Sequence, residues 1–183
     1  MAKLIVCLTG MPGSGKSTIV SALKTKGLEA LNLGDGVRAE AKRRNLEPSG
    51  DNLGKLMLEL REKNGPGAIA ELLTEPIKNS QSKVIIVDGI RSTAEIEVLK
   101  NAGSVKLLSI EATADTRYKF LSSRGRSDDP TTKEKFEERD NRELGVGIGE
   151  SIAIADETIS NSNITLNELT ELAYKIIEKW TDT

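Results

Sequence analysis

Residues 3–18 read Lys-Leu-Ile-Val-Cys-Leu-Thr-Gly-Met-Pro-Gly-Ser-Gly-Lys-Ser-Thr. The run from Leu to Thr at its start is almost entirely apolar, which is typical of a short strand buried on both faces of a parallel sheet. It leads into Gly10, Gly15, Lys16 and Ser17, which have the spacing of the Walker A phosphate-binding loop, or P-loop. The stretch therefore predicts a strand, a phosphate loop and a helix in succession, which is the opening unit of an α/β domain.

The P-loop residues have distinct chemical roles. Glycines let the backbone turn tightly and point its N–H groups at phosphate oxygens, and the start of the helix near Lys16 adds a positive end. We expect Lys16 to reach the β- and γ-phosphates of ATP, and the Ser17 hydroxyl to bind Mg²⁺. The residues expected to bind nucleotide here are Gly10, Met11, Pro12, Gly13, Ser14, Gly15, Lys16, Ser17 and Thr18.

The composition limits the classes of function. The chain has 183 residues and a formal net charge of −2, which predicts a single domain over residues 1–183 without an overall nucleic-acid-binding surface. It has no histidine, which excludes histidine bases and ligands. The single cysteine, Cys7, fits a core position in a protein of the reducing cytoplasm. The first apolar run is too short to span a membrane.

Further strands are expected at residues 28–33, 83–88, 105–110 and 157–160, with helices between them. This alternation predicts a parallel sheet covered by helices on both faces. The connection over residues 34–80 contains about three helices and predicts an inserted helical subdomain over the mouth of the site. The glycines between Gly145 and Gly149 predict a loose segment.

Charged residues follow the strands at the edge where ligands bind in such sheets. Asp88 ends a strand, where an acidic residue steadies the magnesium shell in P-loop enzymes. Arg91 follows at the same edge and suits bidentate binding of phosphate. Asp35 and Arg38 follow the second strand. We expect all four side chains to face one site.

A polar loop, Arg124-Gly125-Arg126-Ser127-Asp128-Asp129-Pro130, lies between two predicted helices. Arg124 and Arg126 are expected to close over the phosphates and neutralise the charge that develops during transfer. The aspartates are expected to hold the loop through ion pairs. With no apolar residue apart from the proline, the loop predicts a short lid over residues 124–131 that phosphate charge draws closed.

Four motifs together resemble the nucleoside monophosphate kinases, in the same order along the chain. They are Gly-Met-Pro-Gly-Ser-Gly-Lys-Ser, Leu-Gly-Asp-Gly-Val-Arg, Val-Asp-Gly-Ile-Arg-Ser and Arg-Gly-Arg-Ser-Asp-Asp-Pro. The chain is most similar to an archaeal adenylate-kinase-related P-loop family, nearly end to end. The resemblance implies a three-layer α/β/α fold with strand order 2-3-1-4-5, a monophosphate-binding insertion and a short lid.

The same resemblance implies roles for individual residues. Asp35, Arg38 and Arg91 match acceptor-side positions, with Arg38 and Arg91 on the acceptor phosphate, while Arg124 and Arg126 match lid arginines. The segment from Ala155 to Asn161 is similar to the end of dephospho-coenzyme-A kinases, where a loop touches the donor adenine, which implies a nucleotide contact for Asn161.

These observations predict an ATP- and Mg²⁺-dependent phosphotransferase acting on a small adenine nucleotide such as AMP. A phosphate acceptor needs no general base, whereas a hydroxyl acceptor, as in dephospho-coenzyme A, would make Asp35 the best available base. Two alternatives from other classes remain open. One is a P-loop ATPase or switch that acts on a protein or ribosomal partner, and the other is a nucleotide-binding module without turnover.

Overall fold

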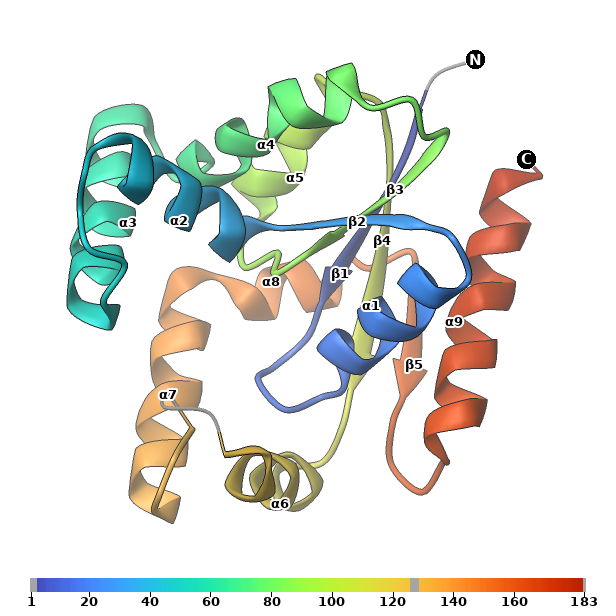
Figure 1. Cartoon of the computed structure of the whole chain (residues 1–183). Coiled ribbons are helices and arrows are strands. Elements are labelled where there is room, and N and C mark those ends of the chain that lie inside the picture. The colour runs from blue at the N-terminus through green and yellow to red at the C-terminus, as the bar shows by residue number, and fades with distance from the viewer. Residues whose placement is uncertain (1–2, 126–128, 183) are drawn as a thin grey trace.

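The structure is a computed structural model that describes residues 3–125 and 129–182. Its parallel sheet has five strands in the order β2-β3-β1-β4-β5, with helices on both faces (Figure 1), which confirms the predicted fold class. The strands are β1 (Leu4–Thr9), β2 (Glu29–Asn32), β3 (Val84–Asp88), β4 (Ser104–Glu111) and β5 (Glu157–Ser160). Within the described residues, no helix is long and apolar enough to cross a membrane.

Alternate residues of the central strand enter two separate apolar cores. Ile5 and Cys7 of β1 pack in the first core, with residues from α2 (Leu33–Arg43), α3 (Gly50–Asn64), α4 (Ala68–Asn79) and α5 (Thr93–Leu99). Val6 and Leu8 pack in the second, with residues from α1 (Lys16–Thr25) and α9 (Leu166–Thr181). A strand with both faces buried must be apolar throughout, which explains the continuous run that opens the sequence.

Strand register brings the predicted functional positions to one edge. Leu8 and Asn32 both pair with Asp88, and Thr9 pairs with Ser109. The carboxyl ends of four strands therefore meet beside the P-loop. At this edge lie α6 (Ala114–Arg124), α7 (Lys133–Val146) and α8 (Ile148–Ala153), which Figure 1 shows next to the loop between β1 and α1.

The glycine-rich segment between residues 145 and 149 is helical, so the expectation of a loose segment was wrong. Helix α7 runs to Val146 and α8 begins at Ile148. Gly147 joins them with a left-handed φ of 110°, a conformation that glycine adopts without strain. The glycines therefore allow one turn between two helices and do not interrupt the secondary structure on either side.

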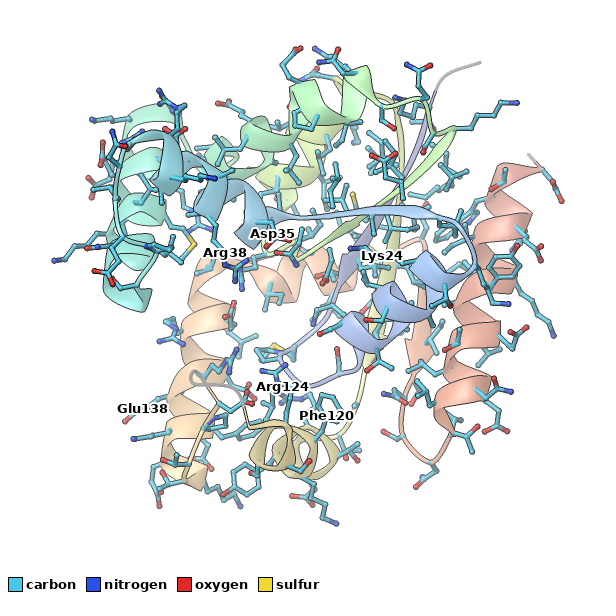
Figure 2. All side chains as sticks on the ribbon, in the orientation of Figure 1. Lys24, Asp35, Arg38, Phe120, Arg124 and Glu138 are labelled. Atoms are coloured by element: carbon cyan, nitrogen blue, oxygen red, sulfur yellow. The ribbon has the colours of Figure 1, made fainter. Side chains whose placement is uncertain are left out.

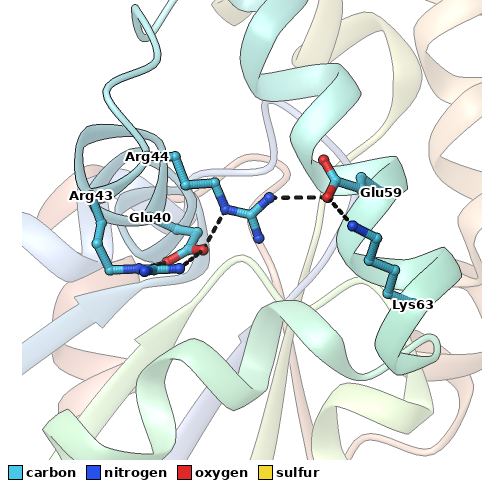
Figure 3. A network of polar contacts seen from close by, with 5 residues as sticks. All are labelled: Glu40, Arg43, Arg44, Glu59 and Lys63. Atoms are coloured by element: carbon cyan, nitrogen blue, oxygen red, sulfur yellow. Dashed lines mark hydrogen bonds and ion pairs between the residues drawn. The ribbon is translucent and has the colours of Figure 1, made fainter.

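A network of ion pairs joins the first two helices of the residue 34–80 connection (Figure 3). Glu40 of α2 accepts hydrogen bonds from Arg43 and from Arg44. Arg44 also donates to Glu59 of α3 at 3.0 Å, and Glu59 accepts from Lys63 at 2.6 Å. The network connects α2 to α3 through the buried Glu40 and the partly exposed Arg44 and Glu59, while the apolar faces of the two helices pack in the first core.

Candidate functional site

The loop between β1 and α1 has the geometry of a phosphate-binding turn. Gly10, Gly13 and Gly15 have φ values of 135°, 82° and 108°. A Cβ atom on Gly10 would lie 2.2 Å from the carbonyl oxygen of Ile110, and one on Gly13 would lie 2.9 Å from the carbonyl oxygen of Arg117. These positions need glycine for backbone conformation and for close packing, so the motif spacing has a structural cause.

The Lys16 ammonium points back into this turn. It donates to the carbonyl oxygens of Gly10 and Met11, and contacts Ser14 Oγ at 3.4 Å. Burial lowers the pKa of Lys16 from 10.5 to about 8, a shift that the nearby Asp88 carboxylate partly opposes. Among the described residues, this partly buried ammonium contacts two carbonyl oxygens and one hydroxyl but no carboxylate, so its charge is well suited to bind phosphate oxygens.

Asp88, at the end of β3, has a carboxylate with one unused oxygen. Oδ2 accepts a hydrogen bond from Asn32 Nδ2 at 3.2 Å. Oδ1 is buried and has no hydrogen-bond partner among the described residues. A buried unpaired carboxylate oxygen is costly unless a cation or water meets it, and Ser17 lines the same cavity. This pair fits Mg²⁺, which takes few protein ligands and completes its shell with water and phosphate.

A cavity of about 240 Å³ extends from the P-loop across the ends of the strands. Its charged lining residues are Lys16, Arg38, Asp88, Arg91, Arg124, Arg139 and Glu143. Cations outnumber carboxylates there, so the cavity favours an anionic ligand with several negative charges. The remaining P-loop residues that line it are Gly10, Pro12, Gly13, Gly15 and Ser17, whereas Met11, Ser14 and Thr18 do not.

Arg91 is held in an orientation that leaves its two terminal guanidinium nitrogens available to bind a ligand. Its Nε donates to Glu143 Oε2 at 2.8 Å, and its backbone N–H donates to Glu95 Oε2 at 2.7 Å. Neither terminal nitrogen of Arg91 has a hydrogen bond among the described residues. An arginine anchored through Nε can present both terminal nitrogens to a phosphate.

Both a protein-family model and individual proteins match this sequence. The chain matches the AAA domain family over residues 9–137. A UPF0200 protein of Hyperthermus butylicus is 38% identical over 179 residues, covering 98% of this chain and 96% of that protein. A UPF0200 protein of Pyrococcus abyssi is 41% identical over 165 residues, covering 87% of this chain and 88% of that protein. The chain belongs to the UPF0200 family.

Solved structures place this UPF0200 chain among P-loop kinase-like folds. The TT1252 protein of Thermus thermophilus has a TM-score of 0.70 at 18% identity, covering 97% of this chain and 98% of that one. A shikimate kinase from Bacteroides thetaiotaomicron has a TM-score of 0.65 at 16% identity, covering 96% and 98%. These likenesses confirm the predicted kinase fold, and the relatives confirm the archaeal P-loop family.

Ion pairs hold the two described ends of the segment that the sequence predicts to be a lid, residues 124–131. Arg124 closes α6 and donates through Nε to Asp129 Oδ2 at 3.1 Å and through Nη2 to Oδ1. Arg139 of α7 lies 3.8 Å from Asp129, whose side chain is 6% exposed. Asp129 therefore holds its end of the segment through ion pairs, as expected for this aspartate, whereas Asp128 lies outside the described residues. Arg126 lies outside the described residues.

Asp35 and Arg38 occupy the first turns of α2 and pair with each other. The side chains are 71% and 57% exposed. Figure 2 shows both at the end of α2 that faces the central space, with Arg124 and Phe120 rising from α6 on the opposite side. Arg38 lines the cavity, but Asp35 is not among the described residues that do. The structure therefore brings Arg38 to the site and leaves Asp35 at its margin.

Asn161 lies behind the P-loop. Its backbone N–H donates to the carbonyl oxygen of Glu111 at 2.7 Å, and its side-chain amide lies against Gly15. Three further residues of this region, Arg139, Glu143 and Arg117, have no motif in the sequence that marks them as site residues. All three belong to charged helices that resemble solvent-facing surfaces in sequence. The one available signal is the helical spacing of Arg139 and Glu143, which places both on one face of α7.

Proposed function

We propose that this protein is an ATP- and Mg²⁺-dependent phosphotransferase of the nucleotide kinase type, which transfers the γ-phosphate to an adenine nucleotide such as AMP. The observation that carries the proposal is the cavity in which Lys16, Arg91 and Arg124 surround the same space as the unpaired Asp88 oxygen. In this assignment the P-loop binds the donor, while Arg38 and Arg91 bind the acceptor phosphate. The lid arginines Arg124 and Arg126 act on the transferred group.

The catalytic contribution of these residues is positioning and neutralisation of charge. Lys16 binds donor phosphate oxygens at the P-loop end of the cavity. Arg124 meets the charge that spreads over the transferred group. Ser17 and Asp88 would hold Mg²⁺, which would supply further neutralisation of the phosphate charge. Asn161, whose side-chain amide donates to the Ser14 carbonyl oxygen, is proposed to support the donor site from behind the P-loop.

The carboxylates of the site favour a phosphate acceptor over a hydroxyl acceptor. A hydroxyl acceptor requires a free base in the cavity. Asp35 does not line the cavity, Asp88 is assigned to the metal, and Glu143 accepts from Arg91. A phosphate oxygen is already ionised and needs no base. The arrangement thus supports AMP-like acceptors over the dephospho-coenzyme-A type.

A wide, shallow hollow on the surface of α2 suggests where the rest of the acceptor lies. It has a volume of about 640 Å³ and is lined by Arg38, Ala39, Lys42, Asn45, Leu46, Glu47 and Pro48. Arg38 lines both cavities. An acceptor with its phosphate on Arg38 can therefore extend a nucleoside toward Leu46 and Pro48. This geometry favours an acceptor larger than a free phosphate.

One assay tests the proposal against its rivals. The protein is incubated with ATP and Mg²⁺ and, in parallel, with AMP, the other nucleoside monophosphates, dephospho-coenzyme A, shikimate or no acceptor, and products are identified by mass. Lys16→Met is the control. Formation of ADP from AMP supports the proposal. Transfer only to a hydroxyl acceptor contradicts the AMP assignment, and phosphate release without an acceptor favours an ATPase or switch.

A further inference from the structure

Three residues on one face of α7 contact groups around the site. Phe136, Asp140 and Glu143 are spaced by four and three residues, so they project from the same side of the helix. Phe136 and Glu143 are buried. Glu138, in contrast, is exposed, and Figure 2 shows it pointing away from the centre of the molecule. Helix α7 thus has an outer face in water and an inner face in contact with the P-loop region.

The first contact is the one that Asp140 makes with Arg117 of α6. Its Nη1 donates to Asp140 Oδ1 at 2.9 Å and to the carbonyl oxygen of Pro12 at 3.1 Å, and its Nη2 donates to Asp140 Oδ2. The guanidinium also lies over the Phe136 ring, 4.9 Å from its centroid. Arg117 is 6% exposed, and both terminal nitrogens are engaged. Arg117 therefore links the P-loop to α7 through hydrogen bonds at both ends.

The second contact reaches Arg91 on the acceptor side. Glu143 takes only the Nε proton of Arg91, which leaves the two terminal nitrogens for a ligand. Arg117 and Arg91 therefore differ in which of their nitrogens remain free for a ligand. Asp140 accepts from both terminal nitrogens of Arg117, and Arg117 also donates to the Pro12 carbonyl oxygen, so the effect of that pair falls on the P-loop backbone. Glu143 fixes the direction of Arg91 and leaves its binding fork open.

We propose that Asp140 and Glu143 are positioning residues, and that α7 sets the donor and acceptor sides of the site together. Asp140 acts on the donor side by holding Arg117 against Pro12, and Glu143 acts on the acceptor side by aiming Arg91. This inference rests on the proposed function for its assignment of donor and acceptor. The link between Asp140 and the P-loop does not depend on which acceptor is used.

Three variants of the full chain separate these effects. Asp140→Asn and Glu143→Gln remove one charge each without changing side-chain size, and Glu138→Gln makes the same chemical change on the outer face of α7. Calorimetry with Mg²⁺–ADP and with AMP is the first measurement. We expect Asp140→Asn to weaken Mg²⁺–ADP roughly tenfold with little effect on AMP, and Glu143→Gln to do the reverse. Glu138→Gln should match the wild type.

Hydrogen exchange without ligand is the second measurement. Asp140→Asn should speed the exchange of amides at residues 13–15, and neither other variant should do so. Arg117→Lys should resemble Asp140→Asn, because a single ammonium cannot span both partners. The inference is overturned if Asp140→Asn leaves both exchange and Mg²⁺–ADP affinity unchanged, or if Asp140→Asn and Glu143→Gln weaken both ligands equally. If the variants exchange as expected but the wild-type protein does not phosphorylate AMP, the result contradicts only the proposed acceptor.

Discussion

The side-chain amide of Asn161 donates a hydrogen bond to the carbonyl oxygen of Ser14 at 2.9 Å, joining the residue after β5 to the P-loop across 147 positions of sequence. The contact supports the loop from behind, which is a different role from the adenine contact that the resemblance implies. If Asn161 supports the loop, replacing it should weaken the binding of every phosphate ligand. If it contacts the adenine, only ligands with a base should bind more weakly.

Asn161→Ala should weaken Mg²⁺–ADP and Mg²⁺–tripolyphosphate by the same factor. Losing one hydrogen bond that supports the loop costs about 0.5–1.5 kcal/mol, or about two- to tenfold in affinity. Calorimetry with both ligands gives the comparison. A loss confined to ADP would show that Asn161 contacts the base or ribose and does not act mainly as a support.

Lys16→Met should reduce transfer by orders of magnitude while the fold is retained, because the charge that bridges the donor phosphates is lost. Rates with ATP and AMP, together with circular dichroism, check this expectation. Near-normal turnover in a folded variant would remove the P-loop lysine from the mechanism.

The same variant should show a distinctive pH dependence of stability. The folded pKa of Lys16 is lowered from 10.5 to about 8, so its charge disfavours folding fully below pH 8. That penalty disappears as pH rises toward 10.5. The stability of Lys16→Met relative to the wild type should therefore fall between pH 8 and 10.5 in denaturant titrations, whereas a constant difference would contradict the lowered pKa.

Arg38→Ala and Arg91→Ala should each weaken AMP by about 1.5–3 kcal/mol and change ATP affinity much less. Their effects on stability should differ. The Arg38 pair with Asp35 is exposed, so its loss costs little, whereas Arg91→Ala leaves Glu143 buried and unpaired. Adding Glu143→Gln to Arg91→Ala should restore part of the melting temperature. Loss of ATP binding with retention of AMP would reverse the assignment of the two sides.

Arg126→Ala should lower kcat more than it raises the KM for ATP, because a lid arginine acts mainly on charge that develops during transfer. Arg126→Lys should restore only part of the rate, since a point charge cannot reproduce the guanidinium fork. Steady-state kinetics of the three forms provide the measurement. An unchanged kcat with a large rise in KM would make Arg126 a ground-state binder.

Glu40→Gln should reduce the acid sensitivity of the α2–α3 network. The hydrogen bond from Arg43 is the largest cause that lowers the pKa of Glu40 from 4.5 to about 2. A depressed carboxylate pKa contributes stability that is present above pH 4.5 and is lost as pH falls toward 2. The melting temperature of the variant should therefore fall less steeply than that of the wild type over this range. Parallel curves would show that Glu40 is not the responsible group.

The sequence allowed the sheet to be predicted because each of its strands has a local signature. The P-loop has a motif, and Val84 to Asp88 is an apolar run ending in a carboxylate. The contacts of Arg117, Asp140 and Glu143 have no such signature. Helix α7 is highly charged throughout, and its tertiary contacts with Arg117 of α6 and with Arg91 after β3 decide which charges are buried. Pairing between helices is a tertiary property, so spacing alone could not separate Asp140 from the exposed Glu138.

Helices α3 and α4 share one apolar core with the sheet, since Leu56 of α3 and Ile69 of α4 pack in the same cluster as Ile5. Moving them away would expose that core, at about 1.5–3 kcal/mol for each large side chain uncovered. Among the described residues, those of α6 and α7 belong to neither core cluster. Helices α6 and α7 are held at the site by polar contacts, such as those of Arg117 with Pro12 and Asp140, so we expect substrate entry to displace this side of the molecule more readily than α3 and α4.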